Sequence, residues 1–146
     1  MKIALLIIDV QKAAHPSPKI VQKIEDLQEK YEHIFVSKFV NEGSFLPTFM
    51  NWAGYDDISL AFTPVPNAKV FEKNVYSSFI DDLKDFDEVH LCGYDTDACV
   101  YKTALDLIEN GVRPVVLAHL CGSENDSYHQ AGIALLKRNI GEQNVR

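Results

Sequence analysis

The chain has 146 residues, of which 47% are hydrophobic and 24% are charged. These values are typical of a globular domain and exclude a disordered, collagen-like or coiled-coil chain. The net charge is −7, from 21 acidic and 14 basic residues, and an acidic protein repels the phosphates of nucleic acids. We therefore interpret residues 1–146 as a single domain that binds no nucleic acid.

The first apolar run, Ile3–Ile8, ends at Asp9. A signal peptide has a longer apolar segment followed by a small-residue cleavage site, and a membrane-spanning helix needs about 20 apolar residues. The run has neither feature, so we interpret it as a buried strand and expect a cytoplasmic protein without membrane contact. Three cysteines without a CxxC spacing agree with a reducing compartment.

Short apolar runs alternate with segments of helical periodicity along the rest of the chain. Runs of this length predict strands buried on both faces, and apolar residues three or four positions apart predict amphipathic helices. The alternation predicts an α/β fold with right-handed crossovers. The predicted strands are Ile3–Ile8, Ile34–Val36, Lys69–Glu72, Val89–Cys92 and Val115–Ala118, and the predicted helices are Ile20–Tyr31, Tyr101–Ile108 and Ile133–Ile140.

The stretch Asn41–Asn67 is irregular and holds three of the six prolines and the only tryptophan, Trp52. We expect a long loop with a short helix around Leu46–Trp52. Long loops in compact domains are often functional.

Three reactive side chains, Asp9, Lys73 and Cys99, follow the ends of predicted strands. If the strands are parallel, their carboxyl ends meet at one edge of the sheet, where ligands bind in such folds. A helix that begins near Thr96 or Asp97 and the ammonium of Lys73 both favour a Cys99 thiolate. A carboxylate can exchange a proton with the thiol, and backbone N–H groups before Cys99 can hold an oxyanion. This combination indicates acyl transfer through a thioester.

Each of these residues also has a purely structural interpretation. Cys99 can be a small core residue, Asp9 can cap a turn, and Lys73 can be a solvated surface charge. Only their joint placement at strand ends favours catalysis.

Three segments resemble the isochorismatase-like cysteine hydrolases, which include nicotinamidases and N-carbamoylsarcosine amidases. The similarity runs along almost the whole chain. It rests on ALLIIDVQ at Ala4–Gln11, VFEKNVYSSF at Val70–Phe79, and VHLCGYDTDACV at Val89–Val100 with TA at Thr103–Ala104.

The resemblance implies a three-layer αβα sandwich with a mostly parallel, Rossmann-like sheet of about six strands. It implies Cys99 as nucleophile, Asp9 as general acid and base, and Lys73 as the third catalytic residue. It further implies a cis peptide at Tyr94–Asp95 that directs the N–H groups of Asp95 and Cys99 at the oxyanion. Family members are commonly dimers or tetramers, so we expect a homo-oligomer.

The sequence departs from the nicotinamidase branch, which binds a metal through Asp-x-His after the second strand. The corresponding stretch, Phe39–Phe45, has no histidine, and neither has Asn41–Asn67. We therefore predict no metal and no cofactor. The expected walls of the substrate pocket are Gln11, Trp52, Tyr76 and Tyr94.

The predicted function is a metal-independent, amidase-type cysteine hydrolase that cleaves a small amide or ureide. The alternatives are an isochorismatase-type vinyl-ether hydrolase without a covalent intermediate, and a non-catalytic oligomeric binding protein of the same fold. The sequence leaves open the substrate, the oligomeric state, and whether the pocket is open or completed by a neighbouring subunit.

Overall fold

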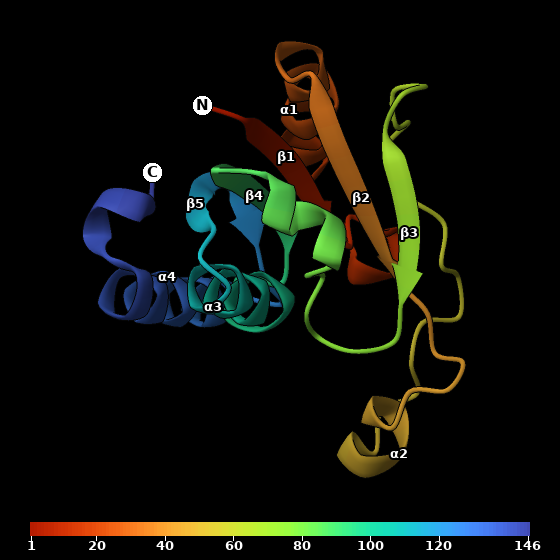
Figure 1. The fold of residues 1–146 in the computed structure, drawn as a ribbon. Helices are drawn as coiled ribbons and strands as arrows, with labels where there is room; N and C mark the ends of the chain where they lie inside the picture. Colours follow the sequence, from red (N-terminus) through yellow and green to blue (C-terminus); the bar gives the residue numbers. More distant parts are fainter.

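In the computed structural model, which describes residues 1–146, a parallel sheet lies between two layers of helices (Figure 1). Its strands pair in the order β3-β2-β1-β4-β5, and every neighbouring pair is parallel. The predicted three-layer α/β fold is confirmed. The strands are β1 (Ile3–Ile8), β2 (His33–Phe39), β3 (Lys69–Lys73), β4 (Glu88–Tyr94) and β5 (Arg113–Gly122).

The sheet has five strands rather than the six or so that the resemblance implied. Beyond β5 the only further pairing is an isolated parallel bridge between Val116 and Val145. The neighbours of Val145, Asn144 and Arg146, are polar, so the apolar character typical of a buried strand is missing there. A sixth strand is therefore reduced to one bridge.

The central strand β1 is apolar throughout because helices cover both faces of the sheet. Its side chains alternate, so Leu5 and Ile7 pack towards Ile24 of α1, whereas Leu6 and Ile8 face the opposite core. That opposite core is closed by α3 and α4. The helices are α1 (Pro18–Leu27), α2 (Leu46–Met50), α3 (Tyr101–Glu109) and α4 (Asp126–Ile140).

The helix boundaries follow local signals. Pro18 opens α1, where its fixed φ is suited to the first turn. The side chain of Asn125 accepts a hydrogen bond from the N–H of Tyr128, so α4 begins earlier than its periodic residues had indicated. The short α2 lies in the expected loop, and it projects away from the body of the domain (Figure 1). None of the helices combines the length and apolar character that crossing a membrane requires.

Gly93 lets β4 lie close against β1 just before the turn that carries Cys99. Its φ is 122°, and a Cβ atom at this position would lie 2.1 Å from the carbonyl oxygen of Ile8. The pairing of β4 with β5 also shifts register between Leu91 and Gly93. Gly93 therefore sets how close the end of β4 lies to β1, and with it the position of the turn that carries Cys99.

Replacing Gly93 by alanine should lower the free energy of unfolding by ~3 kcal/mol or more, because a backbone clash adds to an unfavourable φ. Gly111→Ala is the matched control: its φ is 78°, but no atom lies within 4 Å of the added Cβ. That variant should lose only about 1 kcal/mol. Chemical denaturation of both variants measures the difference, and equal losses would contradict the close approach at Gly93.

Candidate active site

The structure brings Asp9, Lys73 and Cys99 together at the carboxyl edge of the sheet. Asp9 follows β1, Lys73 ends β3, and Cys99 lies in η4 (Thr96–Val100), a π-helical turn between β4 and α3. The Nζ atom of Lys73 lies 2.7 Å from Oδ2 of Asp9 and 3.5 Å from Sγ of Cys99. Three strands far apart in the sequence thus deliver an ammonium, a carboxylate and a thiol to one point.

Asp9 is buried, and its two carboxylate oxygens have different environments. Its backbone has a φ of 50°, a left-handed conformation that aspartate tolerates and that turns the chain away from β1. The hydroxyl of Ser37 donates to Oδ1 over 2.8 Å, and Ser37 in turn contacts the hydroxyl of Ser78 over 2.7 Å. Oδ2 accepts no hydrogen bond beyond its ion pair with Lys73, which leaves it available to a proton.

Lys73 is held by four acceptors. Besides Asp9 and Cys99, its Nζ donates to the backbone carbonyl oxygens of Val75 and Tyr76, both over 2.8 Å. An ammonium has only three protons, so the longest contact, to the sulfur, is the weakest. The side chain is 6% exposed. Lys73 therefore acts as a fixed positive charge behind Asp9 and Cys99.

The Cys99 thiol lies against the cavity described below, and its surroundings favour the protonated form over the thiolate. Burial raises its pKa most, the charge of Asp9 raises it further, and Lys73 only partly opposes them. The hydroxyl of Thr103 donates to the Cys99 carbonyl over 2.6 Å and accepts from the N–H of Ser78 over 2.8 Å, which ties the turn to the segment after β3. The geometry favours a thiol that gives up its proton to Asp9 over a preformed thiolate.

The turn before Cys99 has an unusual backbone. The Tyr94–Asp95 peptide bond is cis, as the resemblance implied, and this expectation is confirmed. The carbonyl oxygen of Asp95 accepts hydrogen bonds from the N–H groups of Ala98 and Val100, but not from the N–H of Cys99. The N–H of Asp95 has no acceptor within the protein. Backbone donors are therefore available on either side of this turn.

A cavity of about 880 Å³ opens onto Asp9 and Cys99. Trp52 and Tyr76, two of the expected wall residues, line it, and so do Phe39 and Tyr55. The rings of Phe39, Trp52 and Tyr55 contact one another at centroid distances of 5.4–5.8 Å. The end of β2 and the long loop together therefore supply an aromatic wall of the cavity.

Gln11 and Tyr94 do not line this cavity, contrary to the sequence-based expectation. The side-chain amide of Gln11 is fully buried and exchanges hydrogen bonds with the backbone of Phe39, so it ties the end of β1 to the end of β2. The ring of Tyr94 lies in the core on the α1 side, and its hydroxyl accepts from the N–H of Ser17 over 3.0 Å. Both residues support the site without facing it.

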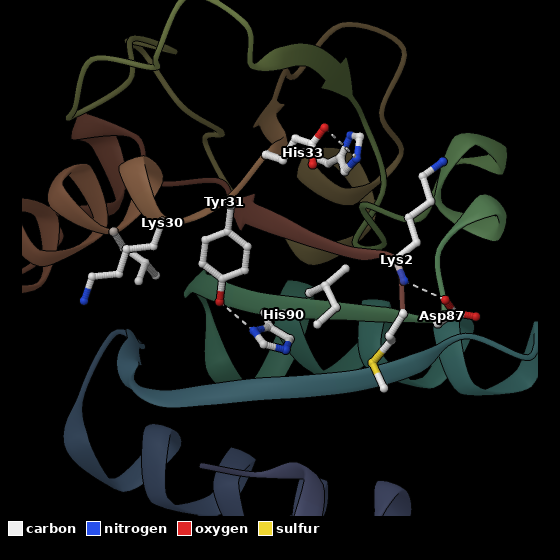
Figure 2. Close-up of a pocket in the computed structure, with 10 residues that line it drawn as sticks. Lys2, Lys30, Tyr31, His33, Asp87 and His90 are labelled. Atoms are coloured by element: carbon white, nitrogen blue, oxygen red, sulfur yellow. Dashed lines mark hydrogen bonds and ion pairs between the residues drawn. The ribbon is translucent and has the colours of Figure 1, made fainter.

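A second cavity, of about 830 Å³, lies at the opposite edge of the sheet, around the amino ends of β1, β2 and β4 (Figure 2). There Nδ1 of His90 lies 2.5 Å from the hydroxyl of Tyr31, and Nε2 lies 2.6 Å from the carboxylate of Glu88. These contacts fasten the segment after α1 to β4. No cysteine lines this cavity, so it offers no comparable nucleophile.

The sequence reasoning missed Ser37, Ser78, Thr103 and Tyr55. Ser37 is a polar residue in the middle of an apolar strand, which is a usable signal because buried hydroxyls need partners. Ser78 and Thr103 lie within the segments that carried the resemblance, but their mutual contact depends on the loop after β3. No sequence signal distinguishes Tyr55 from the other aromatic residues of its loop.

Residues 3–143 match the model of the isochorismatase family, described as an isochorismatase domain. The chain therefore belongs to the isochorismatase family. It is 32% identical over 112 residues to isochorismatase family protein 2B of Dictyostelium discoideum, covering 64% of this chain and 52% of that protein. It is 35% identical over 85 residues to an uncharacterized isochorismatase family protein, PncA, of Bacillus subtilis, covering 53% and 46%. The chain thus spans about half the length of these relatives.

Solved structures with the same fold include a pyrazinamidase of Pyrococcus horikoshii in complex with zinc, with a TM-score of 0.80, 19% identity, and coverage of 100% of this chain and 98% of that one. A nicotinamidase of Bacillus subtilis gives a TM-score of 0.77, 22% identity and 97% coverage of both chains. An isochorismatase-like hydrolase from Alkaliphilus metalliredigens gives 0.80, 20%, and coverage of 99% and 94%. At these identities the similarity establishes a shared fold.

The residues of this chain do not fit a zinc site like the one named for the Pyrococcus protein. No three histidine, cysteine, aspartate or glutamate side chains converge closely enough to hold a metal ion. In the cavity, Asp97 is engaged by the hydroxyl of Ser123 over 2.5 Å.

The Asp9→Asn variant should make Cys99 react faster with iodoacetamide at pH 7. Removing the carboxylate removes a charge that raises the thiol pKa, while Lys73 remains to stabilise the thiolate. The alkylation rate at pH 7 should rise roughly tenfold for each unit by which the pKa of the Cys99 thiol falls, because the thiolate fraction rises by that factor. Mass spectrometry of the alkylated peptides measures it, with buried Cys92 and Cys121 as internal references.

Asp97→Asn is the matched control, because it removes a carboxylate of the same cavity that is not among the groups acting on Cys99. Its alkylation rate should stay near that of the unaltered protein. A slower reaction of Asp9→Asn would contradict the described electrostatics.

Proposed function

We propose that this chain is a cysteine hydrolase of the amidase type, acting on a small amide or ureide without a metal. The observation that carries the proposal is the contact of one buried ammonium with both a carboxylate and a thiol at the floor of an open cavity. Membership of the isochorismatase family and the shared fold with nicotinamidases and a pyrazinamidase support it.

In the first half of the reaction, Oδ2 of Asp9 accepts the proton of the Cys99 thiol, and the sulfur attacks the substrate carbonyl carbon. Oδ2 suits this step because its only partner is the ion-paired ammonium of Lys73, whereas Oδ1 already accepts from Ser37. A C–S bond forms and the carbonyl oxygen becomes an oxyanion. When this intermediate collapses, the C–N bond breaks, Asp9 returns its proton to the leaving amine, and a thioester on Cys99 remains.

In the second half, Asp9 accepts a proton from a water molecule, which attacks the thioester carbon. The C–S bond breaks, and the proton on Asp9 returns to the sulfur. The products are the amine and a carboxylic acid, or a carbamic acid from a ureide. Each half leaves the total charge of Asp9, Lys73 and Cys99 unchanged, so the buried site never acquires an uncompensated charge.

Lys73 acts as a positioning residue whose charge offsets that of Asp9 or of the thiolate, whichever is ionised. The oxyanion is held by the backbone N–H groups of Asp95 and Cys99. The free N–H of Asp95 supports this role. Trp52 and Tyr76 line the space next to the scissile bond.

We also propose that the chain works as a homo-oligomer, either a dimer or a tetramer, in the reducing environment of the cytoplasm. Phe45, Phe49 and Met50 on and beside α2 are 72%, 82% and 55% exposed, which is unusual for large apolar side chains on a monomer. Met50 also lines the cavity, so a neighbouring subunit on α2 would help to close it. All three cysteines are free, which suits a reducing compartment.

The Cys99→Ala variant should lose at least about 10³-fold in kcat on any small amide or ureide that the protein hydrolyses, because the covalent route is removed. Ammonia release from a panel of primary amides and ureides measures turnover. Mass spectrometry of the quenched reaction should show an acyl group on the peptide containing Cys99.

Cys121→Ala, which removes another free thiol, is the control and should retain turnover once circular dichroism shows that it is folded. Equal turnover by Cys99→Ala and the unaltered protein would exclude the mechanism, and ammonia release without an acyl adduct would count against the covalent thioester intermediate.

The double variant Phe45→Ser/Phe49→Ser should shift the protein towards the monomer. The two rings stack at 5.8 Å and are both exposed, so they can be removed without opening the core. Light scattering after size-exclusion chromatography measures the mass, with Ile108→Ser, at a 41% exposed position on α3, as the control. A monomeric unaltered protein would contradict the proposed assembly.

A further inference from the structure

The charged groups that line the active-site cavity are mostly acidic. Four carboxylates face it, from Asp9, Asp95, Asp97 and Glu124. Asp9 is compensated by Lys73, and Asp97 accepts from Ser123. The remaining two carboxylates have no hydrogen-bond or ion-pair partner on the protein.

The basic groups do not balance this excess. Lys102 lines the cavity, but its ammonium lies 2.5 Å from the carboxylate of Asp106. Lys73 lies behind the cavity and is fully engaged. His15 is the remaining basic lining residue, and it is exposed. A substrate carboxylate would therefore meet unpaired negative charge and no free lysine or arginine.

Asp95 is the carboxylate best placed to contact a substrate. It is partly buried and stands four residues before Cys99, at the start of the nucleophile turn. Its side chain does not cap that turn. Burial, and then the charges of Asp97, Asp9 and Glu124, raise its pKa to about 6. It is thus ionised at neutral pH, with no cation of the protein beside it.

The aromatic wall also favours a cation. The rings of Trp52 and Tyr55 line the cavity, and neither is in contact with a cation of the protein. Burial, followed by the charges of Asp95, Asp9 and Cys99, raises the pKa of Tyr55, which keeps its phenol protonated beside these groups. A positive group between a carboxylate and aromatic faces gains both ionic and cation–π stabilisation.

We infer that Asp95 is a specificity-determining residue that binds a protonated amine on the substrate, opposite the aromatic wall of Trp52 and Tyr55. This inference rests on the proposed function and narrows it: the preferred substrate is a small amide or ureide with an ammonium group a few atoms from the scissile carbonyl. Neutral analogues bind less well, and carboxylate analogues bind least.

Three matched primary amides test the inference: β-alaninamide ends in an ammonium, butyramide in a methyl group, and succinamate in a carboxylate. With the unaltered full chain, kcat/KM for β-alaninamide should exceed that for butyramide about tenfold or more, and succinamate should be the poorest of the three. The Asp95→Asn variant should bring the first ratio close to one and improve succinamate relative to butyramide. Glu109→Gln, which removes one exposed acidic charge far along α3, should leave both ratios as they are.

The pH dependence separates recognition from a structural role. The ratio of kcat/KM for β-alaninamide to that for butyramide should fall as the pH drops through about 6, because Asp95 becomes neutral while the amine stays protonated. In Asp95→Asn the ratio should not change in this range. A ratio independent of pH in the unaltered protein would overturn the inference.

Failure of this inference can be told apart from failure of the proposed function. The same three compounds are also tested as protectants of Cys99 against iodoacetamide, which needs no turnover. Hydrolysis of all three at similar rates would leave the hydrolase in place and overturn the role of Asp95. Selective protection by β-alaninamide that is lost in Asp95→Asn, without any hydrolysis, would support cation binding and count against the amidase. Equal protection by all three compounds would overturn the inference whether or not they are hydrolysed.

Discussion

The buried ion pair between Asp9 and Lys73 is the interaction on which the rest of the site depends. Both side chains are almost fully removed from water, at 3% and 6% exposure. A buried charge is destabilising unless it is paired and its remaining valences are satisfied. Here Ser37 donates to the carboxylate, and the carbonyls of Val75 and Tyr76 accept from the ammonium. A Cys99 thiolate beside this pair would add a second negative charge, and burial together with the charge of Asp9 raises the pKa of the thiol.

The order of the strands explains how these side chains meet. Lys73 ends the edge strand β3, Asp9 follows β1, and β2 lies between them. The pairing of Phe39 with Lys73 fixes the level at which β3 ends, and the N–H of Asp9 donates to the carbonyl of Ser37 on β2. The hydroxyl of Ser37 on β2 also donates to the carboxylate of Asp9 and so fixes its orientation beside the end of β3. The sheet register therefore sets the ion-pair geometry.

The sequence was sufficient for the strands and for the edge at which the reactive groups gather, because both follow from apolar runs and from where they end. For individual side chains it was sufficient in some places and insufficient in others. Tyr94 has the same parity along β4 as buried Cys92, and it packs into the same core, so strict alternation would have placed it correctly. Gln11 could not be placed, because its partner Phe39 lies on another strand and its direction depends on the left-handed backbone at Asp9. Tyr55 depends on the path of a long loop, which local propensities do not determine.

The distribution of charge separates the chemistry from the recognition of the substrate. The pair of Asp9 and Lys73 is neutral overall and contacts the thiol, so the transfer of a proton from Cys99 to Asp9 leaves the net charge of the three groups unchanged. The unpaired carboxylate of Asp95 lies on the cavity wall and supplies that field instead. A divalent metal is no substitute for the missing positive charge, because the donors do not converge. An ammonium group can neutralise the carboxylate of Asp95 without several converging ligands, because it carries its charge on a flexible stem and demands less exact geometry than a metal ion. The same acidic cavity whose donors do not converge on a metal can therefore accept an amine.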